Sequence, residues 1–260
     1  MRQPILTNLT QHAINRQQYD DKAQAYLNSQ VHAEGAEFAK MRALLSEQGA
    51  NNVLDLGCGG GHVSYQIAPV VKQVTAYDLS PAMVDNVIAH ATTLGLTNIN
   101  AQVGCAEQLP FAEGQFEAII SRYSAHHWQS VPQALQEMHR VVRKDGKVII
   151  FDILGHSHPI INNFLQTIET IRDPSHVRDY NLAEWTTMAE MAGFRIQTIE
   201  KGTLTLDFAS WVKRMNTPTE AVATICHLQQ TASEMVKRYF AIQADGSFTI
   251  ETLYLVLTKT

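Results

Sequence analysis

The stretch Val53-Leu54-Asp55-Leu56-Gly57-Cys58-Gly59-Gly60-Gly61-His62-Val63-Ser64 decides how this chain folds. Its first four residues form a short apolar run that is typical of a strand buried in a parallel sheet. The glycines that follow allow a sharp turn and the close approach of a ligand to the backbone. After His62 the apolar residues recur at helical spacing. This order predicts the first βα unit of a nucleotide-binding α/β fold, with unpaired N–H groups at the start of the helix.

The glycine spacing does not fit a dinucleotide site. The pattern Gly-x-Gly-x-x-Gly would need glycine at position 62 or 64, where His62 and Ser64 stand. The run from Asp55 to Gly61 does fit Asp-x-Gly-x-Gly-x-Gly, and here the sequence resembles the first motif of class I S-adenosylmethionine (SAM)-dependent methyltransferases. An acidic residue in this loop repels a pyrophosphate but suits a ligand with an ammonium group and a sulfonium. A tight turn without a ligand is the alternative.

Composition favours a globular enzyme. The chain has 260 residues, of which 45% are hydrophobic and 17% charged, and this length predicts one large domain. A net charge of −5 and the lack of a basic block argue against a nucleic-acid surface. No apolar run approaches the roughly 20 residues of a membrane span, and the N-terminus lacks the apolar core of a signal peptide. Three cysteines without a Cys-x-x-Cys pair favour a reducing cytoplasm and no zinc site.

Strands and helices alternate after the glycine loop. Strands are predicted at 73–77, 99–103, 116–121 and 147–153, with helices at 80–95 and 131–142 between them. This alternation predicts a parallel, doubly wound sheet. Asp78 ends the second strand, close to the offset of roughly 20 residues from the first glycine at which an acidic residue binds ribose hydroxyls. A carboxylate that only favours the dipole of the next helix is the alternative at Asp78.

Residues 104–111, Gly-Cys-Ala-Glu-Gln-Leu-Pro-Phe, resemble a stretch of the methyltransferases similar to the ubiquinone and menaquinone C-methyltransferases. In that family this loop holds the adenine, often through an Asp or Asn. Cys105, a weak hydrogen-bond acceptor, stands at that place here. The His126-His127-Trp128 run and the segment 211–214, Trp-Val-Lys-Arg, resemble a bacterial subgroup of YcgJ-like proteins. The resemblance covers nearly the full chain.

The resemblance implies SAM as the cofactor, S-adenosylhomocysteine as its product, and no metal. Asp55 is expected to orient the glycine loop and to receive the ammonium group of the methionine moiety. Asp78 is expected to bind the ribose. The full set of expected cofactor contacts is Asp55, Gly57, Cys58, Gly59, Gly61, Asp78, Leu79, Met83, Cys105, Ala106, Glu107 and Arg122.

The acceptor side is expected at the carboxyl end of the fourth strand. Methyl transfer from a sulfonium is an in-line displacement, so positioning supplies most of the rate, and a base is needed only if the acceptor must lose a proton. His126 is the first candidate for acceptor contact or base, and His127 the second; both could equally be structural histidines. The expected acceptor contacts are Tyr26, His32, Tyr123, His126, His176 and Arg178. The His156-Ser157-His158 segment is interpreted as a solvated loop.

The strand-helix alternation breaks after residue 154. The expected organisation of residues 1–260 is a lid (1–34), a SAM-binding core (35–155), an inserted helical cap (156–215), and C-terminal helices with the last strand (216–260). Dimerisation is the alternative use of the cap, and a homodimer is possible. The expected fold is a doubly wound, mostly parallel, Rossmann-like sheet, to which the resemblance adds seven strands and an antiparallel last one.

The function expected from these features is that of a cytoplasmic SAM-dependent methyltransferase with a small, partly apolar acceptor. A SAM-binding protein without catalysis, used in regulation or as a scaffold, is the alternative from another class. A nicotinamide oxidoreductase is disfavoured by His62. Whether the methyl group goes to carbon, nitrogen or oxygen stays open.

Overall fold

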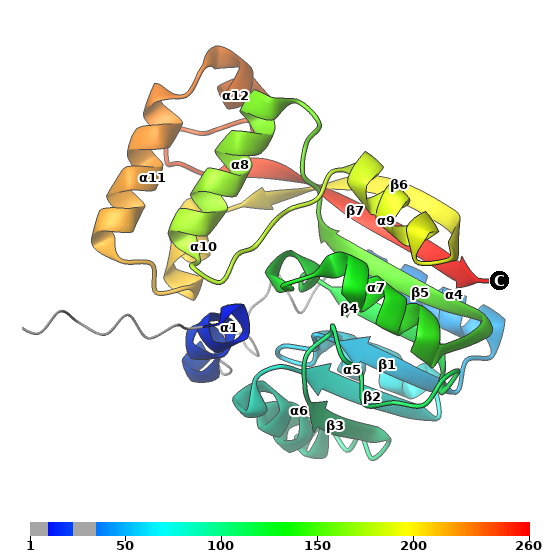
Figure 1. The fold of residues 1–260 in the computed structure, drawn as a ribbon. Coiled ribbons are helices and arrows are strands. Elements are labelled where there is room, and N and C mark those ends of the chain that lie inside the picture. The colour runs from blue at the N-terminus through cyan, green and yellow to red at the C-terminus, as the bar shows by residue number, and fades with distance from the viewer. Residues whose placement is uncertain (1–9, 23–34) are drawn as a thin grey trace, which may run out of the picture.

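A seven-stranded sheet forms the centre of the molecule, and the computed structural model describes residues 10–22 and 35–260 around it (Figure 1). The strand order is β3-β2-β1-β4-β5-β7-β6. The first five strands are parallel, and β7 runs antiparallel to both β5 and β6. This confirms the predicted doubly wound, mostly parallel sheet with an antiparallel last strand. The strands are β1 (Asn52–Leu56), β2 (Gln73–Asp78), β3 (Ile99–Val103), β4 (Phe116–Arg122), β5 (Val142–Ile153), β6 (Phe194–Leu206) and β7 (Phe248–Lys259).

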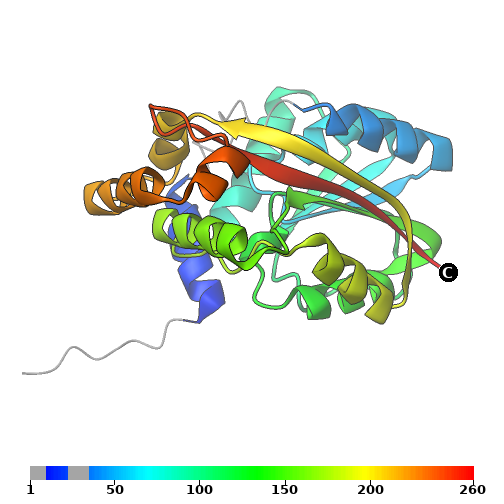
Figure 2. The same ribbon diagram turned by 90° about the horizontal axis from the view of Figure 1, so that it is seen from above.

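Helices cover both faces of the sheet (Figure 2). On one face α4 (Glu37–Gln48), α5 (His62–Ile67) and α6 (Pro81–Thr93) pack on one set of strand residues. On the other face α7 (Val131–Val141) and α9 (Leu182–Met191) pack on the alternate set. Val53 and Leu54, adjacent in β1, belong to opposite clusters. Burial on both faces explains why this strand is a continuous apolar run.

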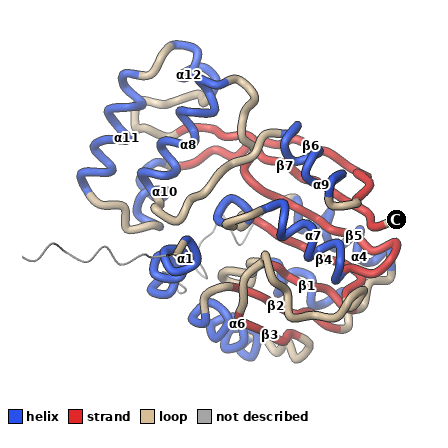
Figure 3. The backbone as a smooth tube through the Cα atoms, viewed as in Figure 1, coloured by secondary structure: helices blue, strands red, loops and turns tan. Residues whose placement is uncertain are grey.

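Four further helices form a separate unit, the helical subdomain: α8 (Pro159–Arg172), α10 (Phe208–Arg214), α11 (Thr219–Thr231) and α12 (Glu234–Tyr239). They pack around a third apolar cluster together with the end of β6 and the start of β7. The tube in Figure 3 shows this unit and α1 (Gln11–Tyr19) beyond the carboxyl edge of the parallel strands.

The helical subdomain differs from the cap expected at 156–215. Helix α9 packs on the sheet and β6 is the edge strand of the sheet, while α11 and α12, expected as a separate C-terminal part, pack against α8. The reason is the pairing of β6 with β7, in which Leu206 lies opposite Phe248. All segments between these two residues therefore lie in one connection and share a core with α8.

Several local features complete the fold. The strand expected at 147–153 begins earlier, because β5 starts at Val142 and shifts register against β4. Phe194–Leu206 is one continuous strand. Asn181 and Glu184 form a capping box at the start of α9. Loop 175–180 is buried through Ser175 and Asp179, although its composition is polar. Among the described residues, no helix combines the length and apolarity that crossing a membrane requires.

Candidate functional site

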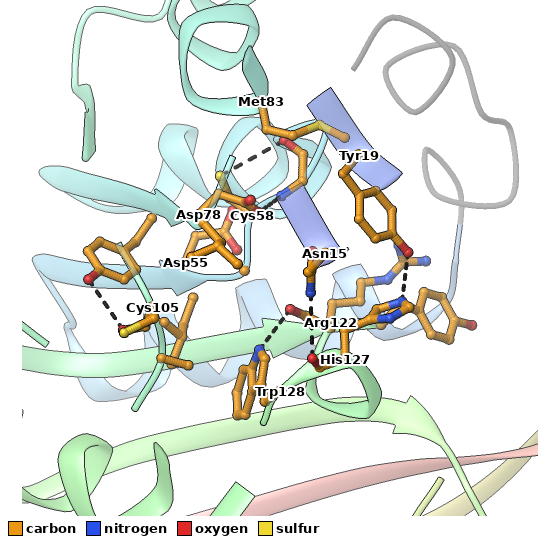
Figure 4. Close-up of a pocket in the computed structure, with 18 of the residues that line it drawn as sticks. Asn15, Tyr19, Asp55, Cys58, Asp78, Met83, Cys105, Arg122, His127 and Trp128 are labelled. Carbon is orange, nitrogen blue, oxygen red and sulfur yellow. Dashed lines mark hydrogen bonds between the residues drawn. The ribbon is translucent and has the colours of Figure 1, made fainter. Parts of the chain in front are cut away.

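A cleft lies at the carboxyl edge of β1, β2 and β4, and it encloses about 930 Å³ including the solvent at its mouth (Figure 4). Every expected cofactor contact except Gly61 lines it. The lining residues on that list are Asp55, Gly57, Cys58, Gly59, Asp78, Leu79, Met83, Cys105, Ala106, Glu107 and Arg122.

The glycine loop needs its glycines for different reasons. At Gly57 an added Cβ would lie 1.9 Å from Ser124 Oγ, so this glycine lets the loop pack against the end of β4. At Gly61 an added Cβ would meet the Tyr65 ring at 2.6 Å. At Gly59, where φ is +48°, an added Cβ would meet no protein atom within 4 Å. Gly59 therefore presents an open side of the loop to the cleft.

Asp55 contributes an unpaired oxygen to the cleft wall. Its Oδ2 accepts hydrogen bonds from Ser64 N at 3.0 Å and Ser64 Oγ at 2.6 Å. Its Oδ1 is buried and has no hydrogen-bond partner within residues 10–22 and 35–260. Burial raises the pKa of Asp55 to about 7, although the two hydrogen bonds from Ser64 act to lower it. A buried carboxylate oxygen of this kind suits a cationic donor.

Asp78 joins the glycine loop to the loop after β2. Its Oδ2 accepts from Gly59 N at 2.8 Å, and its Oδ1 accepts from Ser80 N at 2.9 Å. Burial raises the pKa of Asp78, and these backbone hydrogen bonds oppose the rise. Ser80 caps α6 by accepting from Met83 N, as predicted. The carboxylate is thus held rigidly at the cleft wall.

The loop after β3 contacts the N-terminal helix α1. Glu107 Oε1 accepts from Ser130 N at 3.1 Å, and Glu107 Oε2 lies 3.2 Å from His12 Nε2. His12, Cys105 and Glu107 also lie close enough to share a metal ion, a grouping that the sequence did not predict. Both carboxylate oxygens of Glu107 are already engaged, so we interpret the group as a polar contact that anchors α1.

Arg122 lines the cleft within a buried ion pair. Its Nε and Nη2 donate to Glu37 Oε1 at 2.9 and 2.6 Å. Its guanidinium lies 4.5 Å from the ring centre of Phe38 and 4.6 Å from that of Tyr123. Arg122 therefore fixes Tyr123 beside the cleft, and its charge is compensated by Glu37.

A second cavity adjoins the cleft and encloses about 480 Å³, again including open solvent. Tyr19, Tyr123 and His127 line both spaces, and we call these three residues the shared wall. The remaining residues that line the second cavity are His126, Ile153, Glu169, Arg172, Leu204, Leu206, Trp211, Arg214 and Ile250.

His126 forms a buried pair with Asp152. Its Nδ1 lies 2.5 Å from Asp152 Oδ1, and Asp152 Oδ2 accepts from Ala125 N at 2.8 Å. Burial opposes the charged form of His126, but the charge and hydrogen bond of Asp152 outweigh it and raise the pKa of His126 to about 9. His126 is therefore a cation at neutral pH. A general base, one of its two predicted roles, would need the neutral form.

His127 is held by a ring of hydrogen bonds that includes α1. Its Nε2 lies 2.7 Å from the Tyr19 hydroxyl, which donates to Asp173 Oδ2 at 3.0 Å. Its Nδ1 lies 3.3 Å from Ser175 Oγ, which donates to Asp173 Oδ1 at 2.6 Å. Burial and the charge of His126 lower the pKa of His127 to about 4. Figure 4 shows Tyr19 directed toward it.

The structure does not bring two predicted acceptor contacts, His176 and Arg178, into either space. His176 is buried with Nε2 3.0 Å from Gln166 Oε1, and burial together with the charges of His126 and His127 lowers its pKa to about 2. The Arg178 side chain is 42% exposed and donates to Glu184. The backbone N–H groups of Val177 and Arg178 instead donate to His126 O, so this loop supports His126. Tyr26 and His32 lie outside the described residues.

Several residues in or beside the two cavities escaped the sequence prediction. Asp152 interrupts the apolar run of β5, and a charge in a buried strand is a signal that was available. Helix α1 contains no buried residue, so its apolar pattern gave no signal for Tyr19. Glu169 and Arg172 lie three residues apart on α8. This spacing is typical of an ion pair on a helix surface, but in the structure both side chains are buried.

Comparisons with known proteins agree with this geometry. A family model described as a methyltransferase domain matches residues 54–150. The chain is 43% identical over 197 residues to the uncharacterized protein YafE of Escherichia coli, spanning 76% of this chain and 95% of YafE. It is 32% identical over 228 residues to the uncharacterized methyltransferase YcgJ of Bacillus subtilis, spanning 88% of this chain and 90% of YcgJ.

Two solved structures share the fold at 30% identity. The crystal structure of YcgJ matches with a TM-score of 0.80 over 85% of this chain and 98% of YcgJ. A Bacillus halodurans structure described as a candidate methyltransferase matches with a TM-score of 0.83 over 86% of this chain and 99% of its own. The predicted resemblance to YcgJ-like proteins is therefore confirmed.

Proposed function

This chain belongs to the class I SAM-dependent methyltransferases, and we propose that it transfers the methyl group of SAM to a small molecule held in the second cavity. The observation that carries the proposal is the shared wall. Because Tyr19, Tyr123 and His127 line both the cleft and the second cavity, a donor in one space and an acceptor in the other would meet at these residues.

The cleft residues fit SAM. The unpaired Oδ1 of Asp55 would take the ammonium group, and the rigid carboxylate of Asp78 would take the ribose hydroxyls. The open side of Gly59 leaves room for the ligand beside the loop, while residues 104–107 would hold the adenine. When bound, SAM supplies an electrophilic methyl group on a sulfonium, and its product is S-adenosylhomocysteine.

The second cavity fits a small, partly apolar acceptor. Leu204, Leu206 and Ile250 supply apolar wall, while His126 and Arg172 supply polar contacts. A cavity that combines apolar walls with placed polar groups is typical of small-molecule sites. The protein's part in the reaction is then to hold the acceptor against the shared wall and to exclude water, so that positioning supplies most of the rate. Residues of the helical subdomain close this cavity.

Calorimetry with S-adenosylhomocysteine tests the donor half of the proposal. The protein should bind S-adenosylhomocysteine and not NAD. Asp78→Asn should weaken the binding by about 1.5–3 kcal/mol, because hydrogen bonds to a charged group are lost. Asp85→Asn, an exposed change on α6, is the matched control and should leave the affinity unchanged. Unchanged affinity in Asp78→Asn, or binding of NAD instead, would contradict the proposal.

Methyl-labelled SAM tests turnover. The protein should transfer label into the low-molecular-weight fraction of a cell extract. A protein that binds S-adenosylhomocysteine but transfers no label would be a SAM-binding protein without catalysis.

A further inference from the structure

His126 presents a cationic N–H donor to the second cavity. Its Nδ1 is occupied by Asp152, and its ring is 11% exposed where it lines the cavity. No described residue forms a hydrogen bond with its Nε2, so this N–H is available to a bound molecule. Asp152 is itself held as an anion, because Ala125 N and Ile153 N donate to its oxygens at 2.8 Å each. Asp152 therefore holds the positively charged ring of His126 in a fixed place; we call these two residues the dyad.

The charged groups that line this cavity favour an anion. They are three cationic side chains, His126, Arg172 and Arg214, and one carboxylate, Glu169. Arg172 is already tied to its surroundings: its Nε donates to Trp211 O at 3.0 Å, and its Nη1 lies 3.4 Å from Glu169 Oε2. Its guanidinium lies 4.9 Å from the ring centre of Trp211. Arg172 is thus engaged by Trp211 and Glu169, although Glu169 Oε1 is buried without a hydrogen-bond partner among the described residues. His126 is a cation of this lining whose second N–H has no partner within the described part of the chain.

Apolar residues supply much of the remaining lining. They are Ile153, Leu204, Leu206, Trp211 and Ile250. A ligand that matches the whole cavity has an apolar body and one anionic group.

We propose that the acceptor binds in this cavity as an oxyanion on an apolar body, an ionised phenol, enol or carboxylic acid, with its charged oxygen on His126 Nε2. The inference rests on the proposed function and names the class of its acceptor. Charge-assisted hydrogen bonds of this kind are roughly twice as strong as neutral ones.

An anionic acceptor also accounts for the charge of the dyad. The acceptor loses its proton to solvent before the transfer, so no base is needed in the cavity. An electron pair of the anion then forms the bond to the methyl carbon, while the electron pair of the broken carbon–sulfur bond stays on sulfur. The negative charge of the acceptor and the positive charge of the sulfonium cancel in this step. A protonated histidine beside the acceptor oxygen holds the anion in place until then.

Two pairs of probes test the inference on the protein saturated with S-adenosylhomocysteine. Each pair matches an anion with a neutral molecule of similar shape: benzoate with benzamide, and 4-nitrophenolate with 4-nitroanisole, at a pH at which both acids are ionised. At least one anion should bind about tenfold or more tightly than its neutral partner. The preferred anion distinguishes a carboxylic acid from a phenol or enol, and the absorbance of 4-nitrophenolate reports its ionised state when bound.

Variants assign the preference to His126. His126→Gln should reduce the preference for the anion to about threefold or less, with unchanged affinity for S-adenosylhomocysteine. His227→Gln, an exposed change on α11, is the matched control and should keep the full preference. Asp152→Asn removes the charge that holds His126 as a cation without changing the cavity lining, and it should also weaken the preference.

Other outcomes would overturn the inference. If neither anion binds better than its neutral partner, or if neither binds at all, the acceptor is not an oxyanion at this place. A preference that survives His126→Gln and is lost in Arg172→Gln would place the anion on Arg172 instead. If the unmodified protein does not bind S-adenosylhomocysteine, this result contradicts the proposed function rather than this inference.

Discussion

Three buried carboxylates near the two cavities differ in charge because their oxygens have different partners. Asp55 has an unpaired oxygen, and burial raises its pKa to about 7. Asp78 accepts backbone N–H groups on both oxygens, yet burial still raises its pKa. Burial also works against the Asp152 carboxylate, but the charge and hydrogen bond of His126 outweigh it and lower its pKa. Asp55 is therefore the carboxylate whose charge responds most readily to a cationic ligand.

The raised pKa of Asp55 predicts that cofactor affinity depends on pH. In the ligand-free protein Asp55 takes up a proton as the pH falls through about 7. An ammonium group beside Asp55 favours the ionised form and lowers its pKa, so binding below this pH must release a proton. The affinity for S-adenosylhomocysteine, measured by calorimetry, should therefore rise with pH up to about 7 and then level off.

Two variants isolate this effect. Asp55→Asn should bind S-adenosylhomocysteine more weakly and without the slope. Asp78→Asn removes another buried carboxylate of the cleft and should keep a slope, displaced to lower pH because the charge of Asp78 helps to raise the pKa of Asp55. An affinity that stays constant or falls as the pH rises would show that Asp55 does not bind the ammonium group.

Gly59 allows a second test with a matched control. Gly59 and Gly95 both have positive φ, +48° and +69°, and an added Cβ at either meets no protein atom within 4 Å. Alanine at either position should therefore cost about 1–2 kcal/mol of folding stability through backbone strain alone. Gly59→Ala should in addition weaken the binding of S-adenosylhomocysteine by about tenfold or more, because the methyl group of the new alanine enters the cleft. Equal affinity in the two variants would show that the glycine loop is only a turn.

At the scale of elements, α1 is held over the site by polar contacts. Gln11 donates to Ser175 O at 2.9 Å, His12 lies 3.2 Å from Glu107, and Tyr19 bridges His127 and Asp173. None of the residues of α1 is buried. An element with few buried apolar contacts opens at a low free-energy cost, as a lid over a binding site must.

Tyr19→Phe should loosen this lid while keeping the aromatic ring. The change removes the hydrogen bonds to His127 and Asp173, each worth about 0.5–1.5 kcal/mol, so amide hydrogen exchange in α1 should become several-fold faster. Release of S-adenosylhomocysteine in stopped-flow experiments should accelerate as well. Tyr239→Phe, which removes a hydroxyl on α12 far along the chain, is the control and should change neither rate. Unchanged exchange in Tyr19→Phe would mean that other contacts hold α1.

At the scale of the whole molecule, local patterns predicted the parallel half of the sheet and most of the residues that line the cleft. Both depend on residues close in sequence, such as Asp55 and Gly59. The helical subdomain could not be predicted, because it depends on the pairing of Leu206 with Phe248 across the β6–β7 connection.

The acceptor half of the site depends on distant contacts in the same way. Tyr19 and His127 are 108 residues apart in sequence. His126 follows β4, and its partner Asp152 lies 26 residues further on, in the neighbouring strand β5. The loop around His176 is polar in composition, and its hydrogen bonds with Gln166 and Asp173 allow it to be buried. Only the folded chain shows that His126 is a cation, because its charge is set by Asp152.

The central claim is that the donor occupies the cleft and the acceptor the second cavity, with the shared wall between them. A crystal structure with S-adenosylhomocysteine bound tests it most directly. The account predicts the ammonium group on Asp55, the ribose on Asp78, and the sulfur at Tyr19, Tyr123 and His127, facing the second cavity. A sulfur atom that faces open solvent, or one that lies remote from the second cavity, would contradict it.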